Sequence, residues 1–234
     1  MKVLLVDSNI MKEFWGAEDI RRYLDLQGIT VSTRRGPEQD LPKNVREYDK
    51  IILSGSLANI TDELDWSIEL ENFVLKAIDA SIPVLGICYG HQLLCRALRR
   101  KEGFTAKETV KFADQPEFGW SEIRRTDKSM LFDNLPKSFY SFSSHFEEVG
   151  QLPKNAKKTA ESTLCGIQGF ELENKPVFGI QFHPEKTWEE GQEALEAQRQ
   201  KKNSQTLLEC PSGKKGYSKT IVQTLFGNFL KLGS

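Results

Sequence analysis

The chain has 234 residues, with 32 Lys or Arg and 33 Asp or Glu, which gives a formal net charge of −1 when histidine is neutral. This balance excludes a surface built to neutralise nucleic-acid phosphates or anionic lipids, because such surfaces concentrate positive charge. Hydrophobic residues make up 38% of the chain, enough for a core of ordinary size. We therefore expect a folded protein that binds neither nucleic acid nor membrane.

Membrane and disulfide classes are also excluded by the sequence. No apolar run of about 18 residues occurs, so no membrane span is expected. Residues 1–7 contain neither the apolar stretch nor the cleavage site of a signal peptide. The cysteines show no CxxC pairing and no metal-ligand spacing: Cys88, Cys95, Cys165 and Cys210. We expect reduced thiols, a cytoplasmic location, and no metal or other cofactor.

The N-terminal part of the chain alternates short apolar runs with helical patterns. The expected strands are Lys2–Val6, Ile29–Thr33, Ile51–Leu53 and Ile82–Ile87. Apolar residues recur at helical spacing between them, first in Met11, Phe14, Trp15, Ile20, Tyr23 and Leu24, and then from Ile68 to Ile78. The first of these helices is expected to end near Gly28. This alternation predicts an α/β fold with a mostly parallel sheet and helices on both faces.

The pattern changes after about residue 104. Further strands are expected at Trp120–Arg124, Phe139–Phe142, Gly166–Glu173 and Val177–Phe182. Short loops join these strands, so they predict antiparallel additions to the sheet. A closing helix is expected over Ile221–Leu230, whose apolar residues form one stripe. Residues 1–234 are thus predicted to form one domain, a three-layer sandwich.

One segment, residues 188–215, is dense in Glu, Gln and Lys. Its first half, Glu189–Gln200, could form a solvated helix, and Pro211–Gly213 is typical of a loop. We interpret the segment as a charged insertion on the surface. A lid or a partner-docking element is the alternative.

The most informative stretch is Gly86-Ile87-Cys88-Tyr89-Gly90, between an apolar strand and a helical pattern. This is the strand–turn–helix form of a nucleophile elbow, with Cys in place of Ser. The glycines permit a tight turn, and the start of the following helix favours the thiolate of Cys88. The amide of Tyr89 is then placed to bind a developing oxyanion.

A thiol nucleophile requires a base, and the base usually requires a carboxylate that orients it. His91 follows the elbow on the outgoing helix and is expected to be structural. His183 ends the strand Val177–Phe182 and precedes Pro184 and Glu185. Because parallel strands share one carboxyl edge, His183 can face Cys88, and Glu185 can orient the imidazole.

The two segments Gly86–Gln92 and Gly179–Glu185 together resemble the triad-type (class I) glutamine amidotransferases, especially the glutaminase domains and subunits of GMP synthetase and their free-standing relatives. The resemblance covers nearly the whole chain. It implies a flavodoxin-like three-layer fold and a Cys-His-Glu triad that hydrolyses the side-chain amide of glutamine through a γ-glutamyl thioester. Carried over, Cys88 is the nucleophile, His183 the general base and acid, and Glu185 the residue that orients His183.

The resemblance also implies binding residues. Leu53-Ser54-Gly55-Ser56 stands in place of the family's Ser-Gly-Gly-Pro loop, so an amide of Gly55 or Ser56 would complete the oxyanion hole with Tyr89. Gln92 corresponds to a position that holds the amino-acid end of the substrate. Ser143-Ser144-His145 resembles the Ser-His segment whose backbone contacts the α-groups of glutamine.

The chain departs from the family pattern at three places. Ser56 and Leu57 replace Gly and Pro of the oxyanion loop, and a positive φ at Ser56 would cost energy. Arg99-Arg100 stands where many relatives have Gly-Gly. The charged segment after Thr187 lengthens a connection that is usually short, and no synthetase motif is present.

Three functions remain open. The first is a glutaminase that takes glutamine as substrate and passes ammonia to a separate synthetase. The second is a γ-glutamyl hydrolase that acts on a γ-glutamyl peptide or amine without a partner. The third is a catalytically weak regulatory or binding protein on the same scaffold. The ammonia acceptor and the oligomeric state are not encoded in any motif of the chain.

Overall fold

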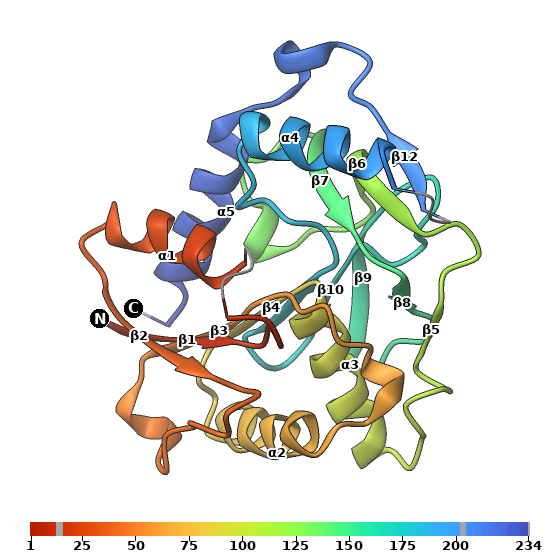
Figure 1. Cartoon of the computed structure of the whole chain (residues 1–234). Helices are drawn as coiled ribbons and strands as arrows, with labels where there is room; N and C mark the ends of the chain where they lie inside the picture. The colour runs from red at the N-terminus through yellow and green to blue at the C-terminus, as the bar shows by residue number, and fades with distance from the viewer. Residues whose placement is uncertain (13–15, 202–204, 234) are drawn as a thin grey trace.

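The computed structural model describes residues 1–12, 16–201 and 205–233. A central mixed sheet contains ten strands of the described residues, in the order β12-β6-β9-β10-β11-β4-β3-β1-β2, with β7 paired to β6. Helices cover both sides of this sheet (Figure 1). The predicted three-layer α/β fold is therefore confirmed.

The parallel part of the sheet comes from β1 (Lys2–Asp7), β2 (Thr30–Arg35), β3 (Lys50–Leu53), β4 (Val84–Ile87) and β11 (Val177–Ile180). Most of these strands consist of consecutive buried residues, as in β4 and β11. A strand covered on both faces has no solvated side, so its sequence is continuously apolar rather than alternating. This is why the short apolar runs of the sequence located these strands closely.

Two hydrophobic cores lie on opposite faces of the sheet. Successive residues of a strand point to opposite faces, so Val3 and Leu5 of β1 pack into one core and Leu4 and Val6 into the other. The first core receives α1 (Ala17–Asp25) and α5 (Lys219–Lys231), and the second receives α2 (Asp65–Asp79) and α3 (Tyr89–Lys101). Figure 1 shows the two helix pairs on either side of the strands.

The antiparallel part comes from the C-terminal half. Its strands are β6 (Glu117–Arg125), β7 (Ser138–Ser144), β9 (Ala156–Glu161) and β10 (Gly169–Leu172). β6 pairs with both β7 and β9, and β10 joins β9 to β11. A separate two-stranded sheet consists of β5 (Val110–Phe112) and β8 (Glu147–Val149). The strands β5, β8 and β9 carry no strong apolar signal, and the sequence did not predict them.

The first helix begins later than its apolar stripe predicts. α1 starts at Ala17, whereas the stripe starts at Met11; Phe14 and Trp15 lie outside the described residues. Asp7 accepts a hydrogen bond from the amide of Asn9, and the Asn9 side chain accepts one from the amide of Met11. Such local side-chain bonds compete with helix formation. Gly16, with a φ of 140°, directly precedes the helix as its N-cap.

The charged insertion is more ordered than a surface excursion. It contains α4 (Trp188–Arg199), close to the expected helix, and β12 (Thr206–Leu208), which pairs in parallel with β6. Trp188 stacks on Trp120 of β6, with ring centroids 4.9 Å apart. Pro211 and Ser212 form a turn, in agreement with the expected loop, and a short 3-10 helix, Gly213–Gly216, follows. What the sequence did not predict is β12, whose order comes from its pairing with β6.

Among the described residues, no helix is both long enough and apolar enough to cross a membrane.

Candidate active site

Cys88 lies at the turn between β4 and α3, as the elbow motif predicts. It is the N-cap of α3 and has φ 51° and ψ −103°, a backbone conformation that is strained for a residue other than glycine. A Cβ atom on Gly86 would lie 2.4 Å from the backbone of Gly90, and one on Gly90 would lie 2.7 Å from Leu53. Both positions therefore need glycine, because the helix passes so close to the strands.

His183 and Glu185 follow β11 and lie beside this turn. The backbone amide of His183 donates to the carbonyl of Phe142 at 2.7 Å, and the Nδ1 atom lies 2.7 Å from Oε1 of Glu185. Both side chains are buried. β11 pairs in parallel register with β4, so the two strand ends bring His183 and Cys88 to the same edge of the sheet.

The electrostatics of this group favour a charged imidazole. Burial acts to lower the pKa of His183, but the negative charges of Glu185 and Cys88, together with hydrogen bonds to both side chains, raise it to about 10. The raised pKa favours a protonated imidazole between the carboxylate of Glu185 and the sulfur of Cys88.

The three residues expected around an oxyanion lie next to Cys88. A Cβ atom on Gly55 would be 2.9 Å from Cε1 of His183 and 3.5 Å from Cβ of Cys88, so the loop after β3 touches both. Tyr89 is the first residue of α3, and its amide therefore has no partner within the helix. Ser56 is absent from the positive-φ residues of the described chain. The replacement of glycine by Ser56 thus costs no backbone strain.

Two spaces meet at Cys88. A small recess of about 30 Å³ is lined by Gly55, Ser56 and His183, among others. A larger cavity of about 470 Å³ opens on the side of Gln92, Ser144 and His145. Cys88 and Ser144 line both spaces. The thiol therefore stands between a narrow space at the imidazole and a wide one beyond it.

Most of the residues expected to bind the substrate line the larger cavity, and one lies behind its surface. Gln92, Ser144 and His145 line the cavity, whereas Ser143 is buried within β7 and is not among the lining residues. The side-chain Nε2 of Gln92 donates to the backbone carbonyl of Glu147 at 2.7 Å and to Oε1 of Gln181 at 3.0 Å. The thiol of Cys88 donates to the carbonyl of Ser144 at 3.7 Å. Ser143 can therefore contribute through its backbone position only.

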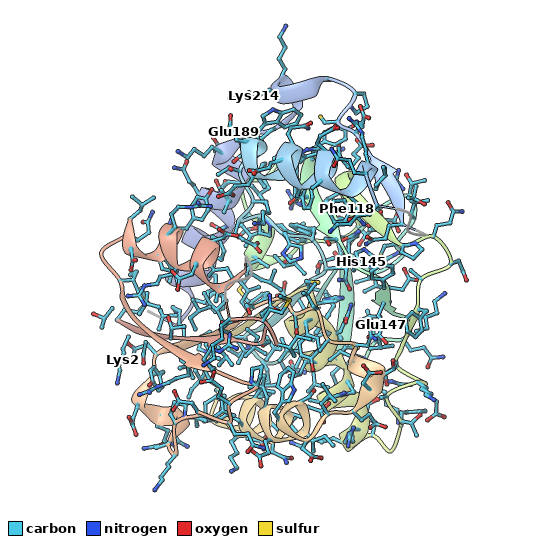
Figure 2. All side chains as sticks on the ribbon, viewed as in Figure 1. Lys2, Phe118, His145, Glu147, Glu189 and Lys214 are labelled. Atoms are coloured by element: carbon cyan, nitrogen blue, oxygen red, sulfur yellow. The ribbon has the colours of Figure 1, made fainter. Side chains whose placement is uncertain are left out.

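A second buried histidine–carboxylate pair supports this wall. Nε2 of His145 lies 3.0 Å from Oε2 of Glu117, which also accepts from Gln168 at 2.7 Å, while Oε1 of Glu117 accepts from Ser162 at 2.7 Å. Burial acts to raise the pKa of Glu117, but hydrogen bonds and the charge of His145 lower it overall. Sequence reasoning missed Glu117, because a single carboxylate at a strand start carries no motif. Figure 2 shows His145, Glu147 and Phe118 in a row below α4.

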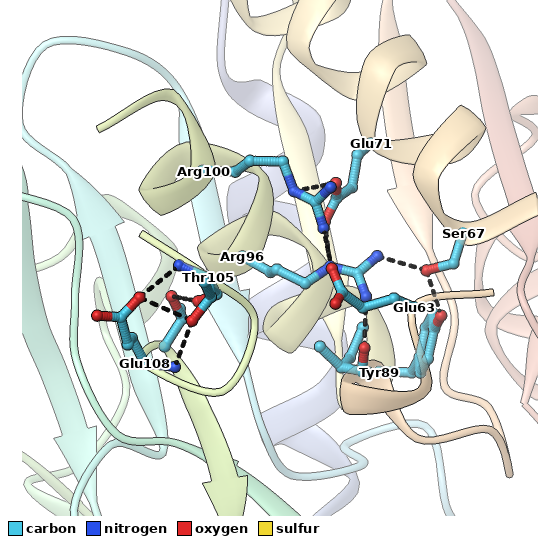
Figure 3. Close-up of polar contacts among 10 residues, drawn as sticks. Glu63, Ser67, Glu71, Tyr89, Arg96, Arg100, Thr105 and Glu108 are labelled. Atoms are coloured by element: carbon cyan, nitrogen blue, oxygen red, sulfur yellow. Dashed lines mark hydrogen bonds and ion pairs between the residues drawn. The ribbon is translucent and has the colours of Figure 1, made fainter. Parts of the chain in front are cut away.

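A buried arginine connects the elbow helix to its neighbours (Figure 3). Arg96 of α3 donates to Glu71, to the hydroxyl of Ser67 and to the carbonyl of Ile60. The hydroxyl of Tyr89 donates to the same Ser67 at 2.7 Å. The side chain of Tyr89 is thereby held away from the thiol, which leaves its backbone amide at the site.

The side chains of Arg99 and Arg100 have partners of their own. Arg99 donates to Gln151 at 2.8 Å and lies over the ring of Phe104 at 3.4 Å. Arg100 donates to Glu63 at 2.6 Å, as Figure 3 shows. The pair therefore braces the C-terminal end of α3, away from the turn at Cys88. His91, expected to be structural, is buried against Phe170, and burial lowers its pKa to about 3.

No group of three or more His, Cys, Asp or Glu side chains that could hold a metal ion occurs in the part of the chain that the structure describes.

Comparison with known proteins decides the family. The family model for class-I glutamine amidotransferases matches residues 17–201. The chain belongs to the class-I glutamine amidotransferase family. Its relatives include a glutamine-hydrolyzing GMP synthase subunit of Methanococcus vannielii, which is 34% identical over 147 residues, 63% of this chain and 69% of the relative. The corresponding subunit of Methanococcus aeolicus is 35% identical over 164 residues, 70% of this chain and 78% of the relative.

Solved structures agree on the fold of this amidotransferase. A glutamine amidotransferase from Methylobacillus flagellatus has a TM-score of 0.79 and 19% sequence identity, with 98% of this chain and 94% of that chain covered. The family model ends at residue 201, so β12 and the 3-10 helix of the insertion lie beyond it.

Proposed function

We propose that this amidotransferase hydrolyses the side-chain amide of glutamine at Cys88 and releases glutamate and ammonia. The observation that carries the proposal is the contact of His183 with both Glu185 and Cys88 at the junction of the two spaces. The relatives named as glutamine-hydrolyzing subunits support glutamine as the substrate.

The first half of the reaction is acylation. The thiolate of Cys88 attacks the amide carbon, and the electron pair of the carbonyl moves to its oxygen. The amides of Tyr89 and of Gly55 or Ser56 are placed to stabilise that oxyanion. The imidazolium of His183 gives its proton to the amide nitrogen, and the carbon–nitrogen bond breaks. Ammonia departs, and a γ-glutamyl thioester remains on Cys88.

The second half is hydrolysis of the thioester. The neutral imidazole of His183 now takes a proton from water, whose oxygen attacks the thioester carbon. The carbon–sulfur bond breaks, glutamate leaves, and the thiolate–imidazolium pair is restored. Glu185 keeps Nδ1 of His183 oriented and compensates its charge in both halves.

The narrow recess favours ammonia as the leaving group. Its volume is about 30 Å³, against about 470 Å³ for the cavity on the other side of Cys88. A γ-glutamyl peptide or amine would require a larger space on the side of His183. This observation favours glutamine hydrolysis over hydrolysis of a bulky γ-glutamyl substrate.

We also propose that a separate synthetase subunit receives the ammonia. The names of the relatives support it, because they designate each one as a single subunit of a synthase. Affinity capture with glutamine present, followed by ammonia assays with and without the captured subunit, tests this. Faster ammonia release with the synthetase is expected; an unchanged rate would contradict the partnership.

The hydrolysis itself is tested by ammonia release from Cys88→Ala and from Cys95→Ala. Cys95 is buried and burial raises its pKa, so it serves as the matched control. We expect Cys88→Ala to abolish glutamine hydrolysis and Cys95→Ala to retain it. Unchanged hydrolysis in Cys88→Ala would refute the assignment.

A further inference from the structure

The insertion supplies one wall of the substrate cavity. Ala194, Ala197, Gln198 and Lys201 line it, and their spacing of three, four and seven residues places them on one helical face. The amide of Lys201 donates to the carbonyl of Gln198 at 3.0 Å, so this residue continues the last turn of α4. Because Ala194 and Ala197 are small, the cavity stays open next to the polar side chains of Gln198 and Lys201.

The wall is anchored on both sides of Lys201. The side chain of Gln198 donates to Oε1 of Gln205 at 2.6 Å, and Gln205 donates to the carbonyl of Glu117 at 3.3 Å. At its other end, α4 is held by the stacking of Trp188 on Trp120. These contacts hold α4 beside the cavity, and Lys201 at the end of its last turn has an exposed side chain.

Lys201 is the one Lys or Arg among the described residues that line this cavity. The carboxylate there, Glu147, already accepts from the amide of Ile60 at 2.6 Å and from Thr61. The imidazole of His145 is engaged with Glu117. A substrate carboxylate that enters the cavity leaves part of its hydration behind, so it needs donors there, and a lysine ammonium adds a charge-assisted bond to those of backbone amides.

The two spaces at Cys88 define which end of the substrate meets Lys201. The leaving nitrogen must face His183, which lines only the small recess of these two spaces. The opposite, amino-acid end then extends into the larger cavity, toward Gln92, His145 and the face of α4. A carboxylate at that end shares the cavity with the long and flexible side chain of Lys201.

We propose that Lys201 forms a carboxylate subsite for the amino-acid end of the substrate. The insertion thus contributes a specificity residue to the active site. This inference rests on the proposed hydrolysis, because it takes the position of the reacting carbonyl from Cys88 and His183.

Steady-state kinetics with two substrates tests the subsite. Glutamine carries the α-carboxylate, and its α-amide replaces that group with a neutral one. For Lys201→Gln we expect about a tenfold lower kcat/KM with glutamine, through KM, and little change with the α-amide. Lys201→Arg should retain most of the wild-type value. Lys214→Gln is the matched control, because Lys214 lies in the same insertion and pairs with Glu189. It should leave kcat/KM unchanged with both substrates.

Labelling of Cys88 provides a readout that does not require turnover. A glutamine-mimicking electrophile with free α-groups should label Lys201→Gln about tenfold more slowly than the wild type. Iodoacetamide, which lacks these groups, should label both at the same rate. Equal losses with both reagents or both substrates, or no loss with either, would overturn the subsite. If the wild type releases no ammonia but labelling still depends on Lys201, the hydrolysis fails and the subsite stands.

Discussion

Replacement of Glu185 by Gln tests the electrostatic basis of the site. The change keeps the shape of the side chain but removes a buried negative charge 2.7 Å from Nδ1 of His183. Two opposite unit charges at that distance attract by roughly 6 kcal/mol at an effective dielectric constant of about 20. Burial of both groups offsets part of this attraction. A glutamine amide can also donate to Nδ1, which selects the wrong tautomer for proton transfer.

We expect kcat of Glu185→Gln to fall by about 10⁴-fold, the loss caused when the orienting carboxylate of a Ser-His-Asp triad becomes an amide. The pH profile should change as well. The pKa of His183 is raised to about 10 with Glu185 as the first of the raising charges, so its removal should move the alkaline limb of the profile to lower pH. Initial rates of ammonia release across that range measure both effects.

The same charge pair predicts a stability change with pH. The folded-state pKa of His183 is raised above its ordinary value, which is about 6.5 in unfolded chains. Protonation therefore stabilises the fold fully below about pH 6.5, and this contribution is lost as the pH rises toward 10. Urea unfolding of the wild type should show that loss, and Glu185→Gln should show much less of it.

Glu189→Gln is the matched control, because Glu189 is an exposed carboxylate in the same stretch of chain. It should leave the rate and both pH dependences unchanged. If Glu185→Gln kept its rate within tenfold of wild type, or kept the alkaline limb in place, the proposed role of the carboxylate would be wrong.

Three further changes probe the surroundings of the site. Gly55→Ala should lower kcat by about 100-fold with little change in Tm, since the added Cβ atom would displace the imidazole of His183; equal rates would contradict the close approach. Arg96→Met should lower the free energy of unfolding by about 3–5 kcal/mol, because it leaves Glu71 buried without its charge partner, and adding Glu71→Leu should restore most of it in urea titrations. Trp188→Ala should raise KM for glutamine and leave kcat unchanged, since it detaches α4 from Trp120. It should also lower the free energy of unfolding by about 2 kcal/mol. An unchanged KM would show that α4 takes no part in substrate binding.

The central strands and the elbow could be predicted because their sequence signals are local. β1, β3 and β4 are continuous apolar runs, and Gly86 and Gly90 bracket the cysteine within five residues. The approach of His183 to Cys88 was also predictable, since parallel strands share one carboxyl edge. The elbow needed only short-range rules and one general property of parallel sheets.

The wall of the cavity could not be predicted in this way. β12 is a strand of three residues, Thr206–Leu208, and its order comes from pairing with β6, far away in the sequence. The contact between Glu117 and His145 likewise depends on how β6 and β7 pair. Such contacts leave no periodicity or motif in the separate segments, because each segment is ordinary until the sheet assembles.

The site therefore combines two parts that meet at Phe142, whose side chain belongs to the wall and whose carbonyl accepts from the amide of His183. The catalytic turn depends on close packing of α3 against β3 and β4, within the two main cores. The wall depends on a third cluster around Trp120, Phe142 and Leu195, to which α4 contributes. Trp188 stacks on Trp120 at 4.9 Å, away from the strand end that holds His183, so we expect its removal to act on substrate binding and leave the reactivity of the thiol intact. The rate of Cys88 alkylation by iodoacetamide in Trp188→Ala measures this separation directly: the wild-type rate is expected, and a large loss would show that the wall and the catalytic turn are one cooperative unit.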